Sequence, residues 1–121
     1  MSGAARRGLA AAGGFACAAA IGLSAYAMHG LDGEDSQRAS LAAAFLFGHG
    51  LAWLVLAPTA VARLRLAGLF VLVAGVALFC GSLLAAVFFD ASTALAPTGG
   101  ILLMLGWLLL AADALRPAVR P

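Results

Sequence analysis

Apolar runs and short polar breaks alternate along the whole chain. The runs cover residues 8–28, 39–57, 66–89 and 99–115, and charged residues are almost absent inside them. A bilayer core is about 30 Å thick, so a spanning helix needs about 20 mainly apolar residues. The fourth run reaches only roughly 26 Å at 1.5 Å per residue, which local thinning of the bilayer accommodates. The pattern predicts a single membrane domain over residues 1–121, an all-α, four-helix transmembrane bundle that is multi-pass.

The polar breaks contain residues that end helices or begin them. The first break, HGLDGEDSQR, holds two glycines and three acidic residues, and Asp35 or Ser36 is expected to cap the next helix. The second break contains Pro58. The third ends in PTGG, where Thr98 is a candidate cap. The glycine pair that follows it, Gly99 and Gly100, suits either an anion at a helix start or close helix packing.

Composition supports the membrane prediction and excludes other classes. The chain is 64% hydrophobic and 10% charged, whereas a soluble domain carries about 25% charged residues. One small water-soluble core cannot hide this much apolar surface, so the lipid bilayer is the expected partner. Arginines occur singly or in pairs without interleaved aromatic residues, which excludes a nucleic-acid footprint. Cys17 and Cys80 lie inside apolar runs and are expected to be free thiols.

Arginine positions predict the orientation. Six arginines fall on one side if all four runs span, namely Arg6, Arg7, Arg63, Arg65, Arg116 and Arg120. The other side has Arg38 and most of the acidic residues, so the positive-inside rule places both termini in the cytoplasm. An alternative interpretation is a secretory signal, because AYA at residues 25–27 matches an A-x-A cleavage site. Cleavage there would leave three spans and an external N-terminus.

Small residues recur every four positions in three of the runs. Lipid tails are as apolar as leucine, so transmembrane helices associate by close packing at small residues. The stripes predict three helices in intimate contact, although a chain this rich in alanine and glycine also produces such stripes by composition. The stripes are Ala10, Gly14, Ala18 and Gly22; Ser40, Ala44, Gly48 and Ala52; and Ala77, Gly81 and Ala85.

His49 lies near the middle of the second run, on a stripe with Phe45 and Trp53. An ionisable residue at that depth is a functional candidate by default. The structural alternative is a neutral imidazole that links the second helix to Ser82 of the third, to Ser24 of the first or to a backbone carbonyl. Such a bond would contribute about 1 kcal/mol. A role in lining a polar path stays open at this stage.

The other polar residues do not form a recognisable chemical site. His29 ends the first run near the acidic loop, where a histidine suits a helix C-terminus. Its depth differs from that of His49 by about 15 Å, so a haem pair is not expected. Asp113 and Arg116 are expected to form a local ion pair. Nucleotide, hydrolase and metalloprotease motifs are missing, so we expect no enzyme, no cofactor and no metal.

Several segments resemble one family of small membrane proteins. SAYAMHGL at residues 24–31, FCGSLL at 79–84, PTGG at 97–100 and the Gly106-Trp107 pair resemble the family known as domain of unknown function 423. His49 matches a histidine in that family's second helix. The sequence departs from the family pattern at Met28, Cys80 and Leu84, and Leu84 replaces a tyrosine. The resemblance implies a multi-pass inner-membrane protein and implies no established activity.

These observations predict a small membrane protein with a structural or accessory role in membrane integrity or complex assembly, through self-association or another membrane protein. The alternative is an oligomeric transporter or channel subunit with His49 lining its path. The candidate functional or packing residues are His29, His49, Gly48, Gly81, Ser82, Gly99, Gly100 and Trp107.

Overall fold

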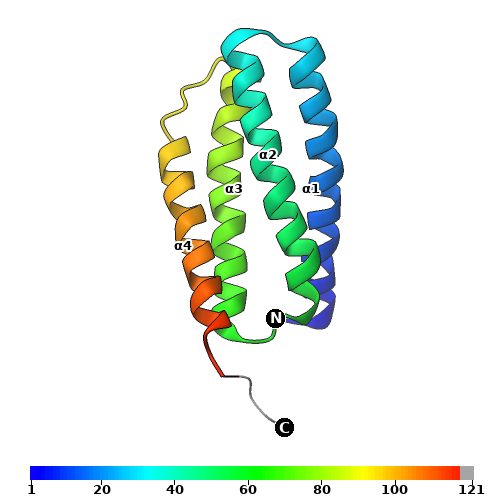
Figure 1. Cartoon of the computed structure of the whole chain (residues 1–121), viewed down its shortest axis with the longest axis vertical. Helices are drawn as coiled ribbons and strands as arrows, with labels where there is room; N and C mark the ends of the chain where they lie inside the picture. Colours follow the sequence, from blue (N-terminus) through cyan, green and yellow to red (C-terminus); the bar gives the residue numbers. More distant parts are fainter. Residues whose placement is uncertain (118–121) are drawn as a thin grey trace.

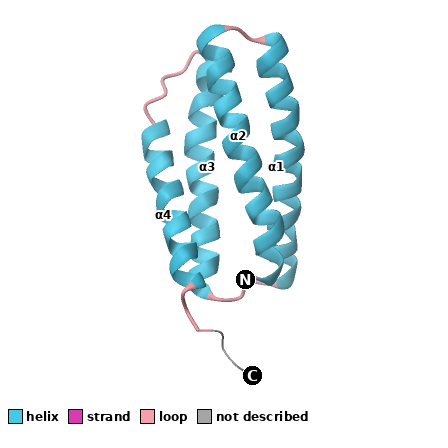
Figure 2. Cartoon of the chain, viewed as in Figure 1, coloured by secondary structure: helices cyan, strands magenta, loops and turns pink. Residues whose placement is uncertain are grey.

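Four helices account for nearly all of residues 1–117, which are the residues that the computed structural model describes. They are α1 (Gly3–Gly30), α2 (Gly33–Leu56), α3 (Arg63–Phe89) and α4 (Ala96–Ala114), with a 3-10 turn, η1 (Ala57–Thr59), after α2 (Figures 1 and 2). Each of the four is long and apolar enough to cross a bilayer. The predicted all-α fold is confirmed.

The helices extend beyond the apolar runs, and the predicted caps are wrong. α2 already begins at Gly33 and has Glu34 and Asp35 in its first turn, where carboxylates interact favourably with the helix dipole. Ser36 lies inside this helix, and its Oγ donates to the carbonyl oxygen of Ala27 in α1 at 2.7 Å. Thr98 likewise lies inside α4, which begins at Ala96. The polar residues therefore continue the helices instead of interrupting them.

The helices form two antiparallel hairpins, α1–α2 and α3–α4, and contacts between α2 and α3 join the two hairpins. α1 packs along α2, α3 packs along α4, and the α2–α3 contact joins the two pairs (Figure 1). The N-terminus, the α2–α3 connection and the end of α4 lie at one end of the molecule, hereafter the arginine-rich end. Five of the six expected arginines belong to this end, and Arg120 lies outside the described residues. The acidic α1–α2 turn lies at the opposite end.

Buried residues recur every seven positions along each helix. Seven residues are close to two helical turns, so side chains at this spacing stay on one face, as in a left-handed coiled coil. Most of the repeating residues are small, which lets the helix backbones approach closely. The buried series are Gly13, Ala20 and Ala27 in α1; Ala43 and Gly50 in α2, continued by Ala57 at the start of η1; Gly68, Gly75 and Ser82 in α3; and Gly99, Gly106 and Asp113 in α4.

The expected four-residue stripes are wrong as packing faces. Only Ala10 among their residues is buried. A Cβ atom on Gly48 or Gly81 would have no heavy atom of another element within 4 Å, whereas one on Gly50 would lie 2.7 Å from the carbonyl oxygen of Gly13. The physical reason is rotation: each four-residue step turns about 40° past a full helical turn, so the stripe leaves the contact face after two steps.

Candidate functional site

A buried polar pair joins α2 to α4 in the middle of the apolar runs. His49 in α2 is 6% exposed, and its Nε2 atom lies 3.0 Å from the indole Nε1 of Trp107 in α4. The other ring nitrogen, Nδ1, lies 2.6 Å from the carbonyl oxygen of Phe45, one turn earlier in the same helix. Both nitrogens of the imidazole are therefore engaged, one within its own helix and one across to α4.

The two partners of His49 determine where its proton is. An indole N–H only donates, so Nε2 must accept, and a carbonyl oxygen only accepts, so Nδ1–H must donate. This arrangement requires the neutral imidazole with its proton on Nδ1. A second proton on Nε2 would face the indole N–H and break the link between the helices. The hydrogen bonding thus agrees with a neutral His49 inside the bilayer.

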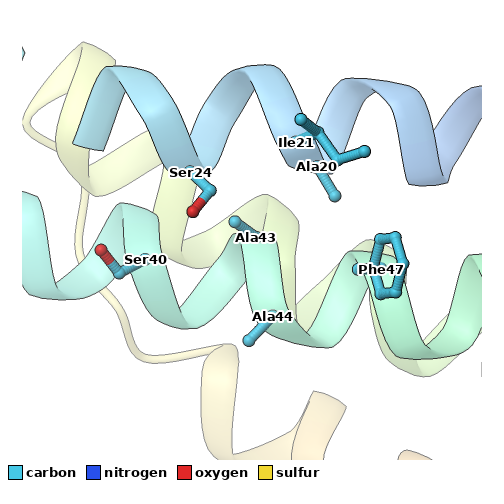
Figure 3. Close-up of a pocket in the computed structure, with 7 residues that line it drawn as sticks. All are labelled: Ala20, Ile21, Ser24, Ser40, Ala43, Ala44 and Phe47. Carbon is cyan, nitrogen blue, oxygen red and sulfur yellow. The ribbon is translucent and has the colours of Figure 1, made fainter. Parts of the chain in front are cut away.

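The serine partners expected for His49 are wrong, and the carbonyl that it binds belongs to Phe45 of its own helix. Ser82 is buried in α3, but its Oγ donates to the carbonyl oxygen of Ser92 at 3.5 Å in the α3–α4 loop. Ser24 lies on α1 and lines a separate groove between α1 and α2, of about 390 Å³, together with Ser40 (Figure 3). Trp107, a candidate from the family resemblance alone, is the residue that reaches His49.

Beside the His49–Trp107 pair lies a long apolar groove of about 780 Å³. We call it the α2–α4 groove. Aromatic residues of α2 and α3 form its inner wall, with the rings of Phe45 and Phe79 4.5 Å apart. Large side chains of α4 form the outer wall, and Ile101 and Met104 are 61% and 62% exposed there. Its chemistry suits an apolar occupant, with the His49–Trp107 pair as the polar feature along its wall.

Two adjacent glycines explain how α4 holds this position. Gly99 faces α3 so closely that a Cβ atom would collide with the backbone of Phe79, at the N and Cα atoms. Gly100 turns to the other side and lines the groove, where a Cβ atom would lie 4.0 Å from the Phe79 ring. The first glycine therefore brings α4 against α3, and the second keeps the groove open. Close packing, the second of the two predicted roles, accounts for Gly99.

The remaining candidate residues lie apart from this site. His29 is exposed at the end of α1. Among residues 1–117 there is no group of three histidine, cysteine or acidic side chains that could hold a metal ion. The predicted Asp113–Arg116 ion pair is wrong, because Asp113 is bound by Arg65 of α3, with Nε 2.8 Å from Oδ2. Gly48 borders a shallow hollow next to His49, and Gly81 faces outward.

Sequence reasoning missed the aromatic wall and the Arg65–Asp113 pair. The sequence places Phe45 one helical turn before His49, and the stacking of the two rings, with centroids 5.9 Å apart, agrees with that spacing. No periodic signal within one helix links it to Phe79. A charged residue inside an apolar run was the available signal for Asp113, because such a residue needs a buried partner.

The His49–Trp107 bond can be measured with a double-mutant cycle. His49→Leu and Trp107→Phe should each lower the free energy of unfolding by about 1 kcal/mol, and the double variant should lose little more than either single one. Both single changes remove the same bond, which is why the losses should not add. His49→Gln keeps a hydrogen-bonding group and should retain most of the stability. Unfolding by denaturant in detergent micelles compares the unchanged protein with all four variants, and additive losses in the double variant would contradict the link.

Comparison with known proteins supports one family. The family model described as protein of unknown function (DUF423) matches residues 23–100, which include His49, the Phe45–Phe79 contact and the glycine pair. No curated protein and no solved structure matches the chain.

Proposed function

Since the chain belongs to the DUF423 family of proteins of unknown function, we propose from its geometry that it is a non-catalytic accessory protein of a membrane assembly. In this proposal the α2–α4 groove binds a transmembrane helix of a partner protein. The observation that carries this proposal is the groove itself, which is an apolar depression between α2 and α4 with Phe79 of α3 on its inner wall. The accessory role is the function predicted from the sequence, and the open apolar groove supports it.

The border of the groove favours a helix as the occupant. Transmembrane helices pack best where small residues let their backbones approach. Gly100 lines the groove from α4, and Ala44 and Gly48 of α2 border the adjoining hollow of about 260 Å³. Gly48 has no neighbour within 4 Å of a Cβ position in this chain, so a partner backbone can come close to it. Small residues that do not pack inside the chain are thus available for packing outside it.

Charge distribution supports the cytoplasmic (inner) membrane as the location, with both termini in the cytoplasm. The arginine-rich end carries Arg6, Arg7, Arg63, Arg65 and Arg116. The opposite end carries the acidic α1–α2 turn. The charge of Arg38 at this end is offset by Glu34, whose Oε1 lies 2.8 Å from Nη2 of the arginine. The positive-inside rule orients such a protein with its arginine-rich end in the cytoplasm. Retention of α1 is part of this proposal, because Gly13 and Ala20 in it belong to the packed core.

A transport role past His49 has less support. Both of its ring nitrogens are engaged, and the groove beside it is lined mainly by apolar side chains. A proton-conducting histidine needs a free nitrogen or a chain of polar neighbours on each side. The accessory role therefore remains the proposal.

Site-specific photo-cross-linking in intact cells tests the groove. A photoreactive phenylalanine analogue at Met104, inside the groove, should form one discrete protein adduct. The same analogue at Phe70, an exposed residue of α3 that does not line the groove, should not form it. Gly100→Leu should abolish the Met104 adduct by filling the groove, and the cross-linked peptide should come from a transmembrane helix of another protein. Adducts with lipid alone, or with a second copy of this chain, would overturn the proposed partner.

A further inference from the structure

A further cavity, of about 300 Å³, lies at the arginine-rich end. At this end α4 finishes beside the start of α3 (Figure 1). We call it the end cavity. Two arginines and one acidic residue line it, together with a hydroxyl and small or branched apolar residues. The lining residues used below are Thr59, Val61, Arg65, Asp113 and Arg116. This cavity is separate from the α2–α4 groove and contains none of the groove's residues.

A buried carboxylate holds Arg65 in position in this cavity. Asp113 has a side chain only 6% exposed, and its Oδ2 accepts from Nε of Arg65 at 2.8 Å. A guanidinium has five N–H donors, and this bond uses the one on Nε. The terminal nitrogens of Arg65 have no hydrogen-bond partner among residues 1–117. The side chain is 34% exposed, so a ligand can reach the remaining donors.

The charge of the cavity favours an anion. The carboxylate of Asp113 offsets the charge of Arg65, and Arg116 adds a positive charge without an ion pair among the described residues. The hydroxyl of Thr59 adds a neutral donor. A planar guanidinium with free terminal N–H groups matches the oxygens of a phosphate group. The geometry points to a phosphate as the group that these donors would bind.

The position of the cavity favours a phosphate that carries an apolar tail. Val61 lines the cavity and is 72% exposed, and Leu115, next to Arg116, is 86% exposed. Exposed apolar residues beside arginines are typical of the boundary between headgroups and acyl chains, where arginine side chains reach towards the headgroups. Basic pockets between transmembrane helices on the cytoplasmic side bind anionic lipid headgroups. We propose that the end cavity binds the headgroup phosphate of an anionic phospholipid.

Lipid titration of the purified full chain in neutral detergent tests this proposal. Phosphatidylglycerol should raise the midpoint of thermal unfolding, because a ligand that binds only the folded state stabilises it. Phosphatidylcholine and inorganic phosphate at the same concentration should not. Arg116→Gln should weaken phosphatidylglycerol binding about fivefold, which corresponds to the loss of one arginine at a membrane surface. Arg65→Lys, which keeps the charge and loses the planar donors, should also weaken it.

Arg7→Gln is the matched control, because it removes one exposed arginine at the same end of the molecule but outside the cavity. It should leave the affinity for phosphatidylglycerol unchanged. Equal losses in Arg7→Gln and Arg116→Gln would mean general surface attraction and would overturn the site. An equal response to inorganic phosphate would assign the cavity to a soluble anion, and an equal response to phosphatidylcholine would remove the role of charge. Full affinity in Arg65→Lys would exclude Arg65 as the phosphate-binding residue.

Discussion

Gly50→Leu should destabilise the protein by at least about 3 kcal/mol and prevent α1 from packing against α2. A Cβ atom on Gly50 would lie 2.7 Å from the backbone oxygen of Gly13 and 3.1 Å from Sγ of Cys17. The backbone oxygen cannot move aside without displacing α1, and leucine adds three further carbons beyond the Cβ. Denaturant unfolding in detergent micelles measures the loss.

Gly48→Leu is the control for this prediction, because it makes the same change two residues away on the same helix. Gly48 has no atom of another element within 4 Å of its Cβ position, so a leucine side chain there can extend into the hollow next to His49 or into detergent without moving a backbone. Its stability should stay within about 0.5 kcal/mol of the unchanged protein. Equal losses in the two variants would mean that α1 and α2 do not approach at Gly50, and the seven-residue packing face would be wrong.

The contrast between these glycines shows which part of the fold could be predicted from the sequence: the helices could, and the face on which each helix packs could not. The four helices followed from run length alone, since each run had to cross the bilayer. The packing face did not follow from small residues at four-residue spacing, because alanine and glycine are common on every face of these helices. A seven-residue repeat was available in the same letters: Gly68 and Gly75 in α3 match Gly99 and Gly106 in α4, each pair seven apart. The spacing, and not the residue type, carried the information.

Contacts between distant helices were harder to predict than the helices. His49 could be identified as a polar residue that needs partners, but nothing within α2 indicates that α4 supplies one. The Nε1 atom of Trp107 reaches it only because Gly99 and Gly106 set α4 close against α3. Asp113 similarly forms its ion pair with Arg65, 48 positions earlier in the sequence, and not with its local neighbour Arg116. In both cases a buried polar group signalled that a bond was required, and the backbone packing decided which residue formed it.

Arg65→Leu should destabilise the protein by about 2–3 kcal/mol, because it leaves the carboxylate of Asp113 buried without its donor. The acid is only 6% exposed, so water replaces the lost bond poorly. Asp113→Leu should cost less, under about 1 kcal/mol, because the long side chain of Arg65 can turn towards water or lipid headgroups. The double variant Arg65→Leu/Asp113→Leu should recover most of the loss, since no charge is left buried.

A second arginine–carboxylate pair has the same N–O distance but an exposed carboxylate, so comparing the two pairs isolates the effect of burial. In α2, Nη2 of Arg38 lies 2.8 Å from Oε1 of Glu34, and the glutamate side chain is 74% exposed. Removing the partner of an exposed carboxylate leaves it hydrated, so Arg38→Leu should change the free energy of unfolding by no more than about 0.5 kcal/mol. Chemical unfolding of all four variants in one detergent compares them directly. If Arg65→Leu and Arg38→Leu lose the same stability, or if the double variant is no better than Arg65→Leu, the carboxylate of Asp113 is not buried in the folded protein.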